Sequence, residues 1–446
     1  RFGEYFFPKE PAANEIAGNA AYSAFEGDLD TTYFNRMGFK LNWKASLDFP
    51  YMGLFIPPTN NNDSLWEKYR QRGVQVGDGM ASANRLQQYS KKFRDKGYYT
   101  LSYFNITEFG NKIVYPYHGP TLAPNDWSNA NDAVYHKLNS ALLKPAGVLP
   151  DWDERPVFSN WEDCVVMDPG DSAYQTFLLN QARLHLEKIP ASAGICIDRL
   201  DWLRYYNQNR DDGVSMVDGR PVHAMVLSWN QAMKRIGPIM HGNGKVIFCN
   251  PLYKRIDLMK EVDGIYDEYG NYSHSLNLSA FLALKKPLIA WTVSRDDFRP
   301  NPDAYFQQHL YLGSFLTVPF PGNDHTILPD STIERYYVDY GPMLIALRGR
   351  EWVLEPNVIR VVDEKAKANI FKVGKKWVIP VIYGAEQPSV DIVLAIPRTF
   401  LQGKSWNMKV LYPGDPVPTK GKSVKYQAQS TLTIPLKRGC ALVILE

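Results

Sequence analysis

The residues best placed to do chemistry lie where a short apolar run ends. Residues 194–202 read Gly-Ile-Cys-Ile-Asp-Arg-Leu-Asp-Trp, so Asp198, Arg199, Asp201 and Trp202 follow directly on a strand-like segment. A buried parallel strand is a continuous hydrophobic run. Residues that come just after such a strand lie at the edge of the sheet where α/β barrels hold their active sites. This segment therefore predicts a catalytic site.

A pair of carboxyl groups suits the cleavage of a glycosidic bond, where one is charged and the other is protonated. We expect Asp198 to be the charged member, because a rigid strand holds it and Arg199 favours its ionised form. The partner is expected at residues 264–268, the end of a second apolar run. Aligning the two runs at their first glycines gives Glu268 the same offset, and the same side of the strand, as Asp198. Glu268 is thus favoured as the acid/base, and Asp267 is the alternative.

Further polar and aromatic side chains follow the predicted strands. Carboxylates and amides can bind sugar hydroxyls, and aromatic rings can stack on sugar faces. The predicted substrate-binding residues are Glu108, Asp168, Arg199, Asp201, Trp202, Asn250, Trp291, Arg295, Asp324 and His325. Arg199, Arg204 and Arg295 would also suit an acidic sugar, since a guanidinium binds carboxylate or sulfate in a bidentate manner.

The elements that must position these residues follow an alternating pattern from Met52 onward. Short apolar runs predict eight strands, at 53–56, 99–104, 164–167, 194–197, 246–249, 264–266, 288–291 and 312–318. Amphipathic stretches between and after them predict helices at 83–96, 172–188, 223–236, 304–310 and 333–350. Eight strand–helix repeats over about 270 residues have the size of a (β/α)8 barrel. A doubly wound open sheet is the alternative.

Three segments of the chain differ in their pattern of apolar and polar residues. Residues 1–50 lack helical periodicity and predict an extended lead-in, residues 51–352 predict the catalytic barrel, and residues 353–446 alternate apolar and polar residues between turn signals. The last segment predicts an antiparallel β-sandwich appended to the barrel.

Composition excludes several classes of function. The 446 residues carry a formal net charge of only +3, without blocks of Lys or Arg, which disfavours a nucleic-acid partner. No apolar run approaches the roughly 18 residues of a membrane span. Phosphate-binding glycine loops, a His-Glu-x-x-His motif and a Gly-x-Ser-x-Gly elbow are absent from the sequence, so no cofactor and no metal are predicted and a serine hydrolase is disfavoured.

Two motifs resemble a known group of enzymes. Residues 166–175, Val-Met-Asp-Pro-Gly-Asp-Ser-Ala-Tyr-Gln, and residues 194–199 resemble the third and fourth barrel strands of secreted retaining α-glycosidases, the group of melibiase-type α-galactosidases and α-glucosidases. The resemblance implies that Asp198 is the nucleophile and that Asp267 or Glu268 is the acid/base. The melibiase motif has a lysine where this chain has Cys196, and α-amylase-type relatives end strand five in glutamate where this chain has Asn250.

Three hypotheses follow for the activity. The first is a retaining glycoside hydrolase acting on an oligo- or polysaccharide, secreted, periplasmic or at the cell surface, and a monomer or homodimer. The second is a carbohydrate-binding barrel that has lost catalysis. The third is a metal-dependent hydrolase or a lyase on the same barrel.

Overall fold

The fold was analysed in a computed structural model of the chain. The structure describes residues 3–22, 24–25, 27–43, 55–57, 60–67, 70–71, 74–75, 80–110, 113, 115–116, 133–144, 155–159, 164–250, 255–268, 275–292, 298, 300–321, 327–384, 390–397, 399–401, 405–415, 424–427 and 431–446. The chain divides into two compact units, residues 1–5 with 42–263 and residues 6–41 with 264–446, and each is described by itself.

The predicted (β/α)8 barrel is confirmed. Its eight strands follow the order β1-β2-β7-β10-β14-β15-β16-β17. They span Asn19–Ala21 (β1), Phe39–Asn42 (β2), Tyr99–Asn105 (β7), Gly194–Asp198 (β10), Val246–Cys249 (β14), Gly264–Asp267 (β15), Leu288–Ala290 (β16) and Phe315–Leu316 (β17). Parallel pairing continues from β17 to β1 through a bridge between Ala20 and Thr317, as a closed barrel requires.

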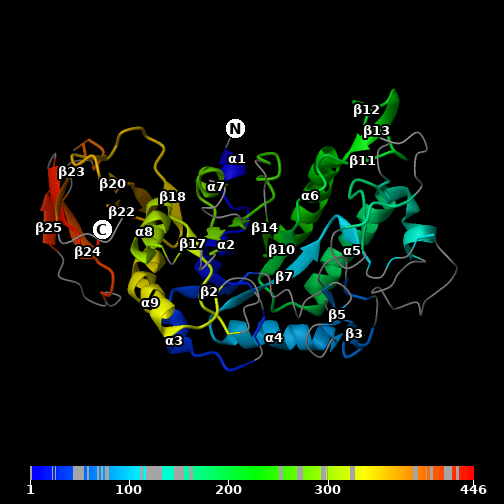
Figure 1. Ribbon diagram of the computed structural model, residues 1–446, viewed down its shortest axis with the longest axis horizontal. Coiled ribbons are helices and arrows are strands. Elements are labelled where there is room, and N and C mark those ends of the chain that lie inside the picture. The colour runs from blue at the N-terminus through cyan, green and yellow to red at the C-terminus, as the bar shows by residue number, and fades with distance from the viewer. Residues whose placement is uncertain are drawn as a thin grey trace. The chain divides into compact units, whose positions relative to one another are not determined.

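In the first unit, three long helices accompany the strands β7, β10 and β14 (Figure 1). They are α4 (Ala83–Asp95), α5 (Ser172–Lys188) and α6 (Met225–His241). Side-chain caps begin two of these helices. The Ser82 hydroxyl caps α4 by accepting from Arg85 N–H, and the Asp171 carboxylate caps α5 by accepting from Ala173 and Tyr174 N–H. Short antiparallel pairs lie between the main elements: β3 (Trp66–Glu67) with β6 (Met80–Ala81), β4 (Arg70–Gln71) with β5 (Val74–Gln75), and β8 (Glu108–Phe109) with β9 (Val165–Val166).

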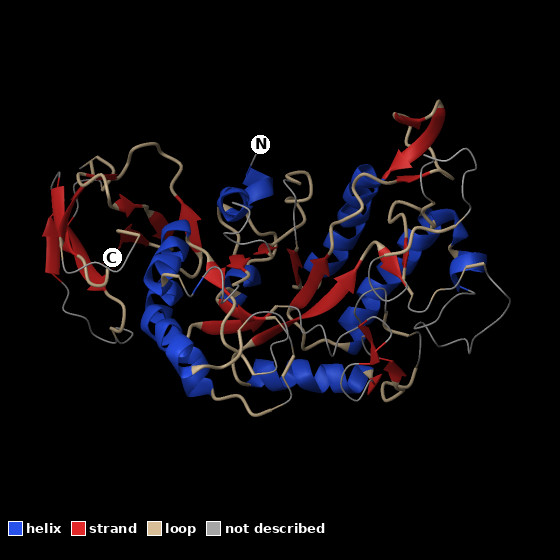
Figure 2. Cartoon of the chain, in the orientation of Figure 1, coloured by secondary structure: helices blue, strands red, loops and turns tan. Residues whose placement is uncertain are grey.

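In the first unit, a three-stranded antiparallel ribbon follows β10. It consists of β11 (Tyr206–Asn207), β12 (Ser215–Val217) and β13 (Arg220–Ala224), and it leads directly into α6. Figure 2 shows its arrows projecting beyond the end of that helix. The ribbon replaces the predicted start of the helix at residue 223, because residues 220–224 pair with both neighbouring strands.

In the second unit, helices α7 (Ser275–Ala283), α8 (Pro302–Leu312) and α9 (Ser331–Ala346) follow β15, β16 and β17. Helix α8 shows why such a helix begins and ends where it does. Asn301 caps it by accepting from Ala304 N–H, Pro302 occupies the first turn, and Gly313 ends it at φ +64°, a conformation that favours glycine. The shorter helices of the chain are α1 (Gly3–Phe6), α2 (Ala12–Ile16) and α3 (Thr31–Arg36).

The C-terminal segment forms two antiparallel sheets around one apolar core, as a sandwich does. One sheet has the order β18-β21-β22-β27-β24-β25 with β20 on β22, and the other has the order β19-β23-β26. The strands are Arg350–Trp352 (β18), Arg360–Val361 (β19), Lys367–Ala368 (β20), Phe371–Val373 (β21), Lys376–Ile382 (β22), Asp391–Ala395 (β23), Ser405–Leu411 (β24), Val424–Gln427 (β25), Thr431–Pro435 (β26) and Cys440–Leu445 (β27).

Two of the eight predicted barrel strands are wrong. Of residues 53–56, only 55–56 are described and they form no strand, while residues 165–166 pair antiparallel with β8 outside the barrel. Their places are taken by β1 and β2, which lie in the predicted lead-in of residues 1–50. These two strands are short, and β2 alternates polar and apolar residues, so neither reads as a buried parallel strand. Because two strands replace two, Asp198 still ends the fourth barrel strand and Asp267 the sixth.

Candidate functional site

The side chain of Asp198, the last residue of β10, points into the barrel. On the neighbouring strand β7, the Phe104 ring packs on His185 of helix α5, 5.5 Å between ring centroids, and so faces the helix layer. Ile197 is the register partner of Phe104, and Asp198 is the partner of Asn105. Because side chains alternate along a strand, Asp198 and Asn105 face the opposite side, the interior. The carboxylate predicted to be the nucleophile is therefore on the inner face of the strand.

Asn250, at the end of the adjacent strand β14, contacts Asp198 directly. Its side-chain Nδ2 donates to Asp198 Oδ1 over 2.7 Å. Its backbone N–H donates to the Ile197 carbonyl over 2.9 Å, which continues the parallel ladder. Asp198 is 2% exposed and Asn250 is fully buried. Asn250 was predicted to bind substrate, and the structure places its amide nitrogen on the neighbouring carboxylate.

A second cluster of charges lies at the ends of β7 and β10. Glu108 is fully buried; it accepts from Asn105 Nδ2 at 2.7 Å and from Ser159 Oγ at 2.5 Å. Arg199 lies between two carboxylates, with its Nε 2.9 Å from Asp201 Oδ2 and 3.5 Å from Glu108 Oε1. Burial raises the pKa of Glu108, and the Arg199 guanidinium opposes that rise. The cluster joins three predicted site residues and adds two, Asn105 and Ser159, that the sequence analysis did not select.

The backbone after β10 is held in an unusual conformation. Arg199 has φ +56° and Trp202 has φ +63°, in the left-handed region that non-glycine residues rarely adopt. The Trp202 ring packs edge-on against Tyr205 and on an apolar cluster that includes Val166. Strained backbone of this kind is typical of functional sites, where the surrounding structure holds it in place.

In the second unit, Asp267 is the last residue of β15 and Glu268 follows it directly. The ring of Tyr266 lies 6.1 Å from that of Tyr22, which follows β1, and two strands that are not neighbours can meet in this way only through the barrel interior. Continuing the alternation of β15 by one residue puts Glu268 on the side of Tyr266. Asp267 Oδ2 accepts from Ser279 Oγ of helix α7 at 2.5 Å. Asp267 is 3% exposed, and Glu268 is half-buried. The alternation favours Glu268 as the residue that can reach a substrate.

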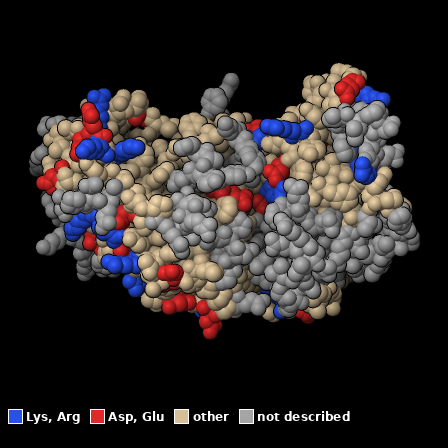
Figure 3. Space-filling view, viewed as in Figure 1, with Lys and Arg blue, Asp and Glu red and all other residues tan. Residues whose placement is uncertain are grey.

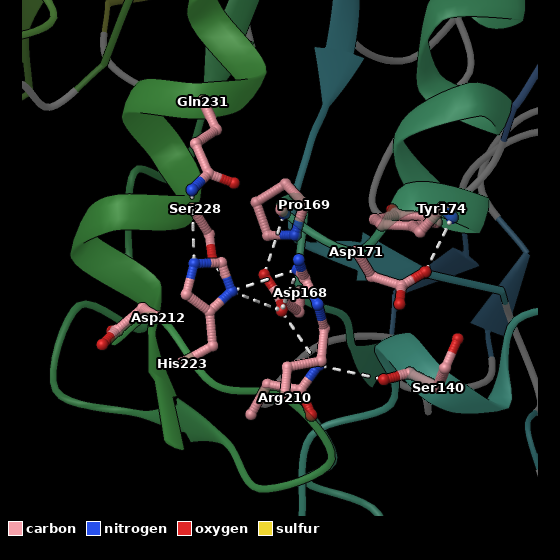
Figure 4. A network of polar contacts seen from close by, with 12 residues as sticks. Ser140, Asp168, Pro169, Asp171, Tyr174, Arg210, Asp212, His223, Ser228 and Gln231 are labelled. Atoms are coloured by element: carbon pink, nitrogen blue, oxygen red, sulfur yellow. Dashed lines mark hydrogen bonds and ion pairs between the residues drawn. The ribbon is translucent and has the colours of Figure 1, made fainter. Parts of the chain in front are cut away.

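Asp168 serves as an anchor for the ribbon (Figure 4). Its carboxylate is fully buried and accepts from Gly170 N–H at 2.8 Å, Asn207 Nδ2 at 2.9 Å and Arg210 Nη1 at 3.2 Å, and it lies 3.3 Å from His223 Nδ1. This geometry does not fit the predicted contact of Asp168 with substrate, because the ribbon occupies the carboxylate.

The charge of Asp168 is stabilised by the same network. Burial alone would raise the pKa of this carboxyl, but hydrogen bonds from His223, Ser228 and Asn207 outweigh it and hold the pKa below its ordinary value. Ser228 Oγ and Asp168 both approach the same ring nitrogen of His223, Nδ1. A nucleophilic triad needs the acid and the serine on opposite nitrogens, so this group is structural.

The remaining predicted residues are placed only in part. Trp291 follows β16 in the second unit and is half-buried, while Arg295, Asp324 and His325 lie outside the described residues. Within the described part of the chain, no three His, Cys, Asp or Glu side chains gather as a metal site would require. Acidic and basic side chains are interspersed in small groups on the face drawn in Figure 3. Among the described helices, none combines the length and the hydropathy that a membrane span requires.

Comparison with solved structures supports the fold. The chain is similar to a cycloisomaltooligosaccharide glucanotransferase from Paenibacillus sp., with TM-score 0.61 and 8% identity over 97% of this chain and 85% of that one. It is also similar to a noncanonic maltogenic α-amylase from Thermotoga neapolitana, with TM-score 0.53 and 11% identity over 100% and 99% of the two chains.

A third similar structure is a GH36 α-galactosidase from Geobacillus stearothermophilus, with TM-score 0.51 and 11% identity over 99% of this chain and 54% of that one. No protein-family model matches the sequence, and no curated protein does. At these identities the likeness establishes the barrel architecture that the strand order also shows.

Proposed function

We propose that this protein is a glycoside hydrolase that cleaves α-glycosidic bonds with retention of configuration. One observation carries the proposal: Asp198 ends the fourth barrel strand on its inner face, buried and held at Oδ1 by a hydrogen bond from Asn250. A carboxylate in that position is fixed by the rigid core of the sheet, as an attacking group must be. The names of the similar structures, all of them enzymes acting on glycosides, support the same class of substrate.

In the proposed reaction, a carboxylate oxygen of Asp198 attacks the anomeric carbon, and the bond from that carbon to the leaving oxygen breaks. Glu268 gives its proton to the leaving oxygen. In the second step Glu268 takes a proton from water, the water oxygen attacks the anomeric carbon, and Asp198 is released. The inward side of β15 supports Glu268 in this role, and the hydrogen bond of Asp267 to Ser279 disfavours the alternative.

The cluster of Glu108, Arg199 and Asp201 would border the sugar site on the β7 side. Asp201 keeps partial exposure, so its oxygens can accept from sugar hydroxyls. The Arg199 guanidinium is already paired with two carboxylates of the chain. A neutral sugar therefore fits better than the acidic sugar that the arginines suggested. Because the proposed substrates include polysaccharides, we further propose that the protein acts outside the cytoplasm.

The test is a panel of 4-nitrophenyl α- and β-glycosides, with maltooligosaccharides and isomaltooligosaccharides, offered to the wild type and to Asp198→Ala. We expect the wild type to hydrolyse at least one α-glycoside and the variant to lose activity by a factor of about 10⁴ or more, because no attacking group remains. Full activity of Asp198→Ala, or no hydrolysis of any panel member by the wild type, would contradict the proposal. Undiminished activity after dialysis against a chelator would separate this enzyme from a metal-dependent hydrolase.

A further inference from the structure

Asparagines end the two strands that flank β10, and the structure gives them different partners. On β7, the Asn105 amide nitrogen donates to Glu108, and its oxygen accepts from the N–H groups of Thr107 and Glu108 at 3.0 and 2.9 Å. Asn105 thus shapes the turn after its own strand. On β14, the Asn250 amide nitrogen instead crosses to Asp198 on the neighbouring strand.

Hydrogen bonds to β10 hold both the backbone and the side chain of Asn250. Its backbone is held by the ladder bond to the Ile197 carbonyl, one residue before Asp198. Its side chain is fully buried, and the 2.7 Å contact lies at the short, charge-assisted end of the range for N–H···O bonds. A donor held in this way restricts the orientation of the carboxylate that accepts from it.

We propose that Asn250 is a positioning residue for Asp198: by holding Oδ1 it fixes the orientation of the carboxylate that attacks the anomeric carbon. This inference rests on the proposed function, in which Asp198 is the nucleophile. The amide neither gains nor loses a proton or a covalent bond in either step. Its effect is to restrict rotation of the carboxylate and to favour the ionised form, which is the form that attacks.

Two consequences distinguish this role from contact with substrate. Removing the donor should lower kcat while KM stays within about threefold, because the substrate does not touch the amide. The acid limb of the kcat/KM profile should also move to higher pH, because the ionised carboxylate has lost a hydrogen bond that favours it. A residue that only bound substrate would raise KM and leave the acid limb in place.

The experiment compares Asn250→Ala and Asn250→Asp with the wild type, using 4-nitrophenyl α-D-glucopyranoside and α-D-galactopyranoside from pH 4 to 8. We expect kcat to fall by about 10- to 100-fold, as for the loss of a hydrogen bond to a charged group. The matched control is Asn243→Asp: Asn243 is exposed, donates to Ile239 O, and precedes β14 at its opposite end. This control should keep the kinetics and the pH profile of the wild type.

A second readout needs no substrate and covers the case in which a variant is destabilised. Unfolding of Asn250→Ala, Asp198→Ala and the double variant by denaturant at pH 7 should show strongly non-additive effects, because each single change removes the same hydrogen bond. Additive effects would overturn the inference. An unchanged kcat and an unchanged acid limb of the kcat/KM profile in the Asn250 variants would overturn it too. In either case, an inactive Asp198→Ala would leave the proposed function unaffected. If Asp198→Ala keeps full activity, the proposed function fails, and this inference fails with it.

Discussion

At the scale of single residues, the alternation of side chains along a strand decides between neighbouring carboxylates. Glu268 and Asp267 are adjacent in the sequence, yet continuing the alternation of β15 puts one on the side of Tyr266, and the other contacts Ser279 of helix α7. The sequence analysis based its preference for Glu268 on the offset between two similar strands, and this preference stays a prediction. The contact of Asp267 with Ser279, twelve positions further along the chain, could not be predicted, because nothing in the sequence between them indicates it.

A pair of isosteric variants tests this assignment. We expect Glu268→Gln to lower kcat/KM for a 4-nitrophenyl α-glycoside by about 10²- to 10⁴-fold, the usual contribution of a general acid. The loss should be smaller for a 2,4-dinitrophenyl glycoside, whose leaving group needs no proton. Asp267→Asn, in which the amide oxygen can still accept from Ser279, should remain within about tenfold of the wild type. A reversed order of the two variants in steady-state kinetics would assign the acid/base role to Asp267.

At the scale of elements, the sequence predicted best where a segment is long and strongly patterned. Helices α4 and α5 lie within one residue of their predicted bounds, with caps at Ser82 and Asp171. Strands β1 and β2 were missed, because β1 has three residues and β2 includes Lys40. The ribbon before α6 was missed because its anchor, Asp168, meets Asn207, Arg210 and His223 only in the folded chain.

The ribbon anchor makes a prediction with a definite pH dependence. At pH 7 we expect Asp168→Asn to lower the free energy of unfolding by about 2–4 kcal/mol, because it breaks a buried charged network. The pKa of Asp168 is depressed in the fold, so its contribution is complete well above the ordinary carboxyl pKa and is lost as pH falls through the lower, folded value. The difference in free energy of unfolding between the wild type and the variant should therefore become smaller below about pH 4.

The matched control is Asp171→Asn, three residues away. Asn caps a helix about as well as Asp, so the change in stability should be under about 0.5 kcal/mol. Denaturant unfolding measures both variants, and amide exchange should show faster exchange in β11–β13 for Asp168→Asn alone. If the difference in free energy of unfolding between Asp168→Asn and the wild type increased at low pH, or if amide exchange in the ribbon were unchanged, Asp168 would not be its anchor.

At the scale of the whole molecule, the change in apolar–polar pattern near residue 353 correctly predicted a C-terminal segment of antiparallel strands. What it could not show is that this segment shares a compact unit with five barrel strands and their helices. Arg438, in the turn before β27, pairs with Asp303 of α8 and Asp339 of α9 at 2.7 and 2.6 Å. These partners are separated by about a hundred residues or more, so spacing in the sequence cannot reveal them.

The central claim is that Asp198 forms a bond to the sugar. It is tested most directly by incubating the protein with 5-fluoro-α-D-glucosyl fluoride and its galacto epimer, whose C5 fluorine slows hydrolysis of a glycosyl-enzyme, and mapping the adduct by peptide mass spectrometry. We predict one added glycosyl group on the peptide that contains Asp198, and none in Asp198→Ala. An adduct on another carboxylate, or turnover of an α-glycoside to the inverted anomer without an adduct, would contradict the account.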